Sequence, residues 1–152
     1  MNKIMDEKII KVWFSDNRIY IKTDKANVLS RPLEAFPLLK EASETQRQRF
    51  EIGLYADEIH WPDIDEDISI ESFYETQEPD YDNDTAKIFK KYPDTNLNAV
   101  AAGAGIHKTL LQKYIYGIKK PSPERFNKIV NALKNFWFLR AEKYEVLRFF
   151  RT

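Results

Sequence analysis

The sequence has no cysteine, only two histidines and no long apolar run, and these absences exclude several kinds of chemistry. Without cysteine, the 152-residue chain can form no disulfide, no thiolate zinc site and no cysteine nucleophile. Two histidines, His60 and His107, are too few for a histidine-rich metal site. No stretch of about 18 apolar residues is present, and charged residues interrupt the N-terminal stretch where a secretory signal would be apolar. We therefore expect a cytoplasmic protein.

The residues that are present divide the chain by charge. Apolar residues make up 43% and aromatic residues 14% of the sequence, which is enough for a packed core. The formal net charge is zero, yet residues 1–84 hold 10 Lys and Arg against 20 Asp and Glu, whereas residues 85–152 hold 14 against 4. A basic half of this kind is expected of a protein that binds phosphates. Alternatively, the opposite charges only hold two domains together.

The acidic half predicts an α+β domain with a small antiparallel sheet and short helices. Residues 9–23 alternate apolar and polar side chains around a turn at 15–17, which predicts a β-hairpin. A third extended piece follows near 27–30, then a short helical passage broken by Pro37 and a helical turn capped by Ser43. Further strands are predicted at 50–55 and 58–61.

An acidic, proline-containing stretch predicts where the first domain ends. Residues 75–84 are polar and show no apolar period. We predict an acidic domain at 1–76, a linker at 77–84 and a basic domain at 85–152.

Residues 59–73, together with the preceding hairpin and the segment 33–39, resemble a small bacterial family of unknown function, family 2442. The resemblance covers about residues 7–76. Members of that family are sometimes joined to a C-terminal repressor-like domain, and some occur beside toxin–antitoxin genes. The resemblance implies a regulator or antitoxin-like role, with no established activity and no catalytic residues.

Two features of the acidic half could indicate chemistry. The carboxylates at residues 63–67 could bind a hard cation, but they lack the central glycine and distal glutamate of a calcium loop. We favour Asp67 or a neighbour as the cap of a short helix at 68–73, and we expect no metal and no other cofactor. His60 has no serine, cysteine or second histidine in a reactive arrangement, so we expect no enzyme.

Residues 100–117 have the spacing of two helices joined by a tight turn. Ala101 is small where the helices would cross, and Gly105, four residues later, can adopt the left-handed conformation that the turn requires. Three apolar residues then fall on one face of the second helix: Ile106, Leu111 and Tyr114. This face is predicted to be buried.

The residues that follow complete a known pattern. Gly117 can end the second helix, and Ser122 with Pro123 can begin the next. With these features, residues 96–133 resemble the lambda-repressor and Cro-like helix-turn-helix family. Two positions depart from the family pattern: Leu97 stands where many members have a polar residue, and His107 replaces the usual Ser or Thr. The resemblance implies an all-α domain whose second helix enters the DNA major groove, often as a dimer. Residues 135–150 are a further helix, or a helix that gives way to a strand from Tyr144.

The outward face of the second predicted helix is the candidate base-reading surface. Long or hydroxyl-bearing side chains can reach base edges, and Gln can pair with adenine through both amide groups. The predicted base-reading residues are Lys108, Thr109, Gln112, Lys113 and His107. A local hydrogen bond at the helix N-terminus is the alternative for His107. The residues predicted to contact phosphates are Tyr116, Lys119, Lys120 and Asn96.

These features predict a two-domain transcriptional regulator that binds double-stranded DNA. A homodimer is expected, through the aromatic C-terminal segment or a sheet edge, and the acidic domain could bind a protein partner; no membrane contact is expected. The alternative is a protein-interaction module, an antitoxin or adaptor, whose helix-turn-helix bundle is only structural. A third hypothesis has the acidic half compete with DNA for the basic half.

Overall fold

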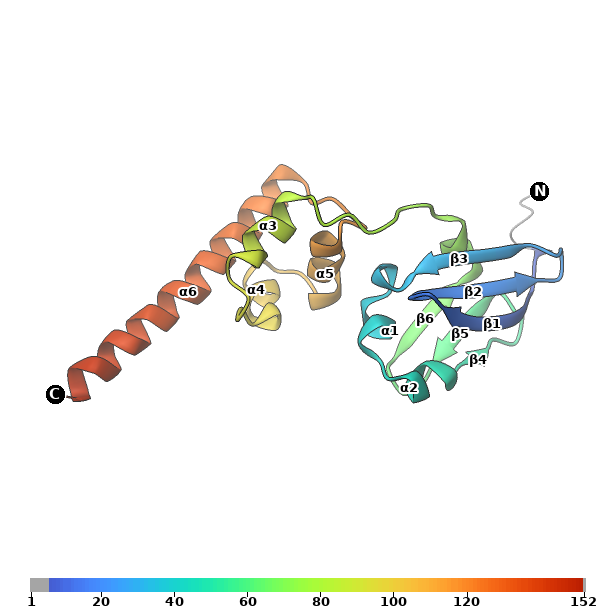
Figure 1. Ribbon diagram of the computed structural model, residues 1–152, viewed down its shortest axis with the longest axis horizontal. Helices are drawn as coiled ribbons and strands as arrows, with labels where there is room; N and C mark the ends of the chain where they lie inside the picture. Colours follow the sequence, from blue (N-terminus) through green and yellow to red (C-terminus); the bar gives the residue numbers. More distant parts are fainter. Residues whose placement is uncertain (1–5, 152) are drawn as a thin grey trace. The chain divides into compact units, whose positions relative to one another are not determined.

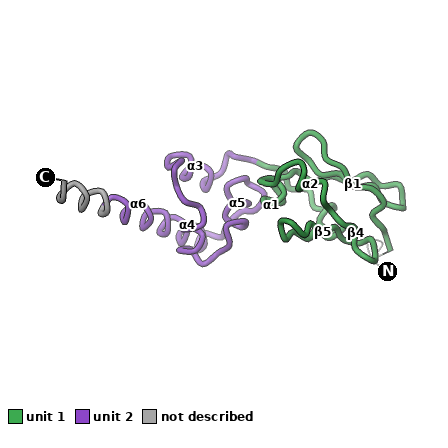
Figure 2. Tube along the Cα trace, turned by 90° about the horizontal axis from the view of Figure 1, so that it is seen from below, with its two compact units in different colours: residues 1–79 green, residues 80–152 purple. Residues whose placement is uncertain are grey.

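The computed structural model describes residues 6–151, and the side chains of residues 6–141. The chain forms two compact units, residues 1–79 and residues 80–152 (Figure 2). Each unit has its own hydrophobic core. The boundary follows Pro79, inside the stretch predicted as a linker. Residues 1–5, part of the N-terminal stretch that is predicted not to be a secretory signal, lie outside the described residues.

Unit 1 opens with a three-stranded antiparallel sheet (Figure 1). Its strands β1 (Ile9–Ser15), β2 (Arg18–Thr23) and β3 (Val28–Pro32) lie in that order. The predicted hairpin is confirmed, and its two turn residues, Asp16 and Asn17, both have positive φ, as a tight hairpin turn requires. Ile19 and Ile21 of β2 are completely buried, so the predicted alternation places one face of this sheet in the core.

A second antiparallel sheet completes unit 1, with β4 (Glu51–Ile52), β5 (Glu58–Trp61) and β6 (Glu66–Ser69) in that order. Along the chain, the two sheets are connected by a 3-10 helix, η2 (Leu33–Ala35), and by the helices α1 (Pro37–Glu41) and α2 (Glu44–Gln48). Pro37 begins α1 rather than breaking a longer helix, because proline is compatible with the first helical turn. Ser43 caps α2, as predicted, and forms a capping box with Gln46.

The prediction that Asp67 or a neighbour caps a helix at 68–73 is wrong. Residues 66–69 form β6, in which Asp67 pairs with His60 of β5. An Asp67 carboxylate oxygen contacts Nδ1 of His60, and this interaction raises the pKa of His60 above its ordinary value of 6.5. The following 3-10 helix, η3 (Ile70–Tyr74), starts only after the strand. Ile68 and Ile70 are both buried, with a polar residue between them, which is the period of a strand.

A buried carboxylate ties the start of unit 1 to both its first sheet and η3. Glu7 accepts hydrogen bonds from the Thr23 hydroxyl (2.5 Å), from the Asn27 amide (2.7 Å) and from the Tyr74 hydroxyl. Burial by itself raises the pKa of the Glu7 carboxyl, but these hydrogen bonds stabilise the ionised form and hold the pKa below its ordinary value of 4.5.

Two arginines of the first sheet bind the C-terminal segment of unit 1. The Arg31 side chain is 1% exposed and donates to the carbonyl oxygens of Glu75 (3.0 Å) and Gln77 (2.8 Å). Arg18 forms an ion pair with Glu78 through both terminal guanidinium nitrogens, Nη1 and Nη2. Residues 75–78, which overlap the start of the predicted linker, are therefore held against the first sheet of unit 1.

Unit 2 consists, in its described residues, of four helices and their connections (Figure 1). They are α3 (Asp84–Lys90), α4 (Leu97–Gly103), α5 (Lys108–Tyr116) and α6 (Pro123–Arg151). The Ser122 hydroxyl accepts the Arg125 N–H at 3.1 Å, so the predicted start of the last helix is confirmed. That helix continues through 144–150, whose side chains lie outside the described residues. Across the described helices, none combines the length and apolar character needed to cross a membrane.

The Glu7 cluster predicts a specific loss of stability at acidic pH. We expect Glu7→Gln to lower the free energy of unfolding of unit 1 by about 1–3 kcal/mol at pH 7, because an amide cannot accept from all three donors. The folded-state pKa of Glu7 is lowered, so its contribution is present above pH 4.5 and is lost as the pH falls through the folded-state value. Urea unfolding, followed by NMR signals of the first sheet, measures both effects.

Glu71→Gln is the matched control, since Glu71 is an exposed carboxylate on η3. It should leave the stability of unit 1 unchanged. Equal losses in the two variants, or a Glu7→Gln deficit that persists undiminished at the lowest pH, would contradict this account.

Candidate nucleic-acid interface

Helices α4 and α5 are joined by a tight connection of four residues, 104–107. Two hydrogen bonds close the end of α4: Gly105 N–H donates to the Ala102 carbonyl (3.1 Å) and Ile106 N–H to the Ala101 carbonyl (3.0 Å). This is the Schellman arrangement, which requires a left-handed residue, and Gly105 has φ of +72°. The predicted role of Gly105 is confirmed.

Helix α5 ends in the same way. Gly117 has φ of +77°, and its N–H donates to the Tyr114 carbonyl (3.2 Å) while Ile118 N–H donates to the Lys113 carbonyl (3.0 Å). A Cβ atom on Gly117 would lie 2.1 Å from the carbonyl oxygen of Asp80. Glycine is therefore needed here for its backbone conformation and also because the chain entering unit 2 packs directly against it.

The entering segment satisfies the last carbonyls of α5. The final carbonyls of a helix have no partner within it. Here Asp80 N–H donates to the Tyr116 carbonyl (2.8 Å), and the Asn83 side-chain amide donates to the Ile115 carbonyl (3.1 Å). The Asn83 Oδ1 atom also accepts the Ala86 N–H (2.8 Å) and so caps α3. The end of α5 and the start of α3 are thus positioned by the same few residues.

The predicted apolar stripe of α5 lies in the core of unit 2. Leu111 and Tyr114 are buried, and Ile106 packs at the edge of the same core. Ala101 of α4 is 2% exposed, in agreement with its predicted place where two helices approach closely. The opposite face of α5 is thereby turned away from this core.

The predicted base-reading residues differ in exposure, and by helix geometry only Thr109 and Lys113 lie opposite the buried Leu111. His107 is exposed at the start of α5, and Lys108, Thr109 and Lys113 are half-buried. His107 is the N-cap residue of α5, but its side chain makes no capping hydrogen bond. The local hydrogen bond that we consider as the alternative role of His107 is therefore not formed.

Gln112 departs from the expectation that it faces outward. Its residue exposure is only 3%, so its amide is not accessible in this structure. Successive residues are rotated by about 100° around a helix, which places Gln112 one step from the buried Leu111, on the flank of the outward face rather than at its centre. A base contact by Gln112 requires this side chain to become accessible.

Two of the residues predicted to contact phosphates have structural roles as well. Asn96 caps α4, where its Oδ1 accepts the Ala99 N–H at 3.1 Å. The Tyr116 ring packs edge-on against Tyr81, with ring centroids 6.0 Å apart. Both residues belong to the ends of α4 and α5, the helix pair around the turn.

The charged residues in the sequence from α4 to the start of α6 are all lysines. No Asp or Glu occurs between Asp94 and Glu124, a stretch with four lysines, Lys108, Lys113, Lys119 and Lys120. The last two are exposed in the connection to α6. They share a hollow of about 650 Å³ with three aspartates from the start of unit 2, Asp80, Asp82 and Asp84, which partly offset their charge.

Within the part of the chain whose side chains are described, no group of three or more His, Asp or Glu residues is placed to hold a metal ion. The carboxylates at 63–67 are divided between separate interactions, since Asp67 contacts His60 and Asp63 lies 3.4 Å from Arg49.

Comparison with known proteins gives a family match for unit 1. Residues 9–79 match the family described as Protein of unknown function (DUF2442), which supports the resemblance inferred from the sequence for the N-terminal part. No curated protein matches the chain. A crystal structure of "Putative DNA Binding Protein NE0471" from Nitrosomonas europaea is 14% identical, covering 86% of this chain and 88% of that one, with a TM-score of 0.36.

Substitution by alanine should destabilise unit 2 to different extents at the two left-handed glycines, Gly105 and Gly117. An alanine in the left-handed region is strained by roughly 1–2 kcal/mol. Gly105→Ala should show this cost alone, because no atom beyond its two chain neighbours lies within 4 Å of the added Cβ. Gly117→Ala should lose more, because Asp80 must also move. Hydrogen exchange of the α5 amides measures the difference. Equal losses in the two variants would show that the entering segment does not pack closely against Gly117.

Proposed function

We propose that unit 2 binds double-stranded DNA through the outward face of α5 and that the protein acts as a transcriptional regulator. The observation that carries the proposal is the pair α4 and α5, joined by four residues and closed at Gly105 and Gly117. This is the connection length of a helix-turn-helix, in which the second helix lies in the major groove. The lambda-repressor-like resemblance of residues 96–133 is part of the proposal.

The charge of the segment supports this role. A stretch of 29 residues, 95–123, carries four lysines and no carboxylate. A protein that neutralises phosphates releases condensed counterions, and this term dominates non-specific affinity. In the proposed complex, Lys108, Thr109 and Lys113 contact base edges, with His107 at the start of the helix.

Phosphate contacts in the proposed complex come from both ends of the helix pair. Asn96 lies at the start of α4, and Tyr116, Lys119 and Lys120 lie at and beyond the end of α5. Such contacts position a protein on the duplex without reading its sequence. A dimer would place two copies of α5 about 34 Å apart on one face of the duplex.

The proposal assigns no reaction, cofactor or metal to the protein. Unit 1 is proposed to receive a protein partner or signal, which would make the protein antitoxin-like. Its 17 Asp and Glu against 10 Lys and Arg argue against a nucleic-acid role for that unit.

The first test of the proposed function is the salt dependence of DNA binding by the full chain. We expect binding to fluorescent random duplex DNA whose affinity falls steeply and linearly, on logarithmic axes, from about 50 to 200 mM salt. Fluorescence anisotropy measures this slope. Failure to bind at the lowest salt would overturn the proposal and favour the protein-interaction module.

Variants then separate base reading from phosphate contact, on a duplex selected from a random pool. Lys113→Ala should cost about 1–3 kcal/mol on the selected duplex and much less on random DNA, whereas Lys120→Ala should weaken both equally. Lys128→Ala is the matched control, an exposed lysine on α6 that pairs with Glu124 at 3.9 Å. Equal effects of Lys113→Ala and Lys128→Ala would contradict the assignment of α5 as the reading helix.

A further inference from the structure

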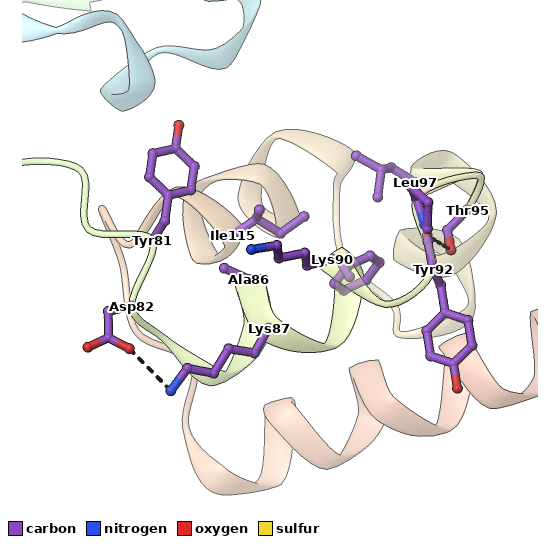
Figure 3. Close-up of a pocket in the computed structure, with 11 residues that line it drawn as sticks. Tyr81, Asp82, Ala86, Lys87, Lys90, Tyr92, Thr95, Leu97 and Ile115 are labelled. Atoms are coloured by element: carbon purple, nitrogen blue, oxygen red, sulfur yellow. Dashed lines mark hydrogen bonds and ion pairs between the residues drawn. The ribbon is translucent and has the colours of Figure 1, made fainter.

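Unit 2 contains a groove that the proposed DNA contacts do not explain. It has a volume of about 690 Å³ and lies between α3, the start of α4 and α5 (Figure 3). This volume is within the range of small-molecule sites, roughly 300–1,000 Å³. The apolar lining comes mainly from Ala86, Phe89, Pro93, Leu97 and Ile115.

Three polar residues of the lining, Thr95, Asp82 and Lys87, are already paired within the protein. The Thr95 hydroxyl donates to the Tyr92 carbonyl (2.7 Å) and accepts from the Trp137 indole (3.0 Å). Asp82 is the only carboxylate in the lining, and it pairs with Lys87 at 3.2 Å. The body of a ligand in this groove therefore meets apolar surface and no unsatisfied polar atom from these residues.

Lys90 differs from the other polar residues that line the groove. Its side chain is exposed, and among the residues whose side chains are described it makes no ion pair. Figure 3 shows its side chain extending across the middle of the groove, between the end at Tyr81 and the end at Leu97. The groove thus combines an apolar lining with one hydrated ammonium group that makes no ion pair within the protein.

We propose that this groove binds a small amphipathic anion, a molecule with a flat apolar body and one carboxylate that pairs with Lys90. The apolar lining excludes a bare phosphate or a strongly hydrated anion as the preferred occupant, because neither would displace water from Leu97 and Ile115 favourably. A neutral apolar molecule would make no ion pair with Lys90, so it should bind more weakly than the anion by the modest amount that an exposed ion pair contributes.

The test is a titration of the full chain, followed by NMR, with naphthalene-2-carboxylate and with its neutral analogue 2-naphthylmethanol. We expect saturable shifts at Ala86, Leu97 and Ile115, and tighter binding of the carboxylate. Lys90→Gln should weaken binding of the carboxylate about two- to fivefold, as expected for one partly exposed ion pair, and leave binding of the alcohol unchanged. Lys128→Gln, which removes an equivalent charge outside the groove, should change neither.

Three results would overturn the proposal. One is the absence of saturable shifts with either compound at millimolar concentration. Another is equal binding of the two compounds with no effect of Lys90→Gln, which would indicate a hollow without anion preference. The third is a shift of the same groove residues with protein concentration alone, which would show that a second copy occupies it. None of these readouts involves DNA, so they are independent of the proposed function.

Discussion

The absence of a side chain at Gly117 is the constraint on which the arrangement of unit 2 depends. Its left-handed conformation ends α5, and its bare Cα allows the Asp80 carbonyl to pack where a Cβ would lie 2.1 Å away. This close approach brings Asp80 and Asn83 to the carbonyls of Tyr116 and Ile115, which the helix cannot satisfy itself. Because Asn83 also caps α3, one contact sets the end of α5 and the start of α3 together.

Unit 1 fastens its outer segments with buried charged groups instead. Glu7 accepts hydrogen bonds from three side chains in two parts of the fold, and Arg31 donates hydrogen bonds to the backbone carbonyls of Glu75 and Gln77. The two arrangements are not equivalent. The Glu7 carboxylate accepts three hydrogen bonds, whereas Nε and Nη2 of Arg31 have no hydrogen-bond partner. The carboxylates of Glu75, 4.0 Å away, and of Glu78 offset the Arg31 charge. Removal of Glu75 would therefore take away the nearer of two carboxylates that compensate a buried cation.

Sequence alone predicts the features that act over a few residues and misses those that join distant ones. Left-handed turns and caps depend on local backbone conformation, and they were predictable at Gly105, Gly117, Ser43 and Ser122. The sequence does not predict the strand β6, because the pairing of Asp67 with His60 joins residues on two different strands. The carboxylates of this segment instead indicate the start of a helix. In the candidate site, periodicity predicts the buried stripe of α5, but it cannot predict that Gln112, at the flank of that stripe, is covered. The groove was also unpredictable, since its lining spans residues 81 to 115.

The groove and the candidate reading helix meet at the segment that holds α5 in place. Tyr81 and Asp82 line one end of the groove, and they belong to the segment that satisfies the last carbonyls of α5, while Ile115 lines it from α5 itself. A bound anion would therefore contact both partners of that attachment. An effect of the anion on DNA binding rests on the proposed function. It should appear mainly in the DNA contacts of Tyr116 and of the lysines beyond α5, and less in those of Lys108, at the opposite end of the helix. The size of the effect is limited by the difference in the ligand's affinity for the DNA-bound and unbound arrangements of α5.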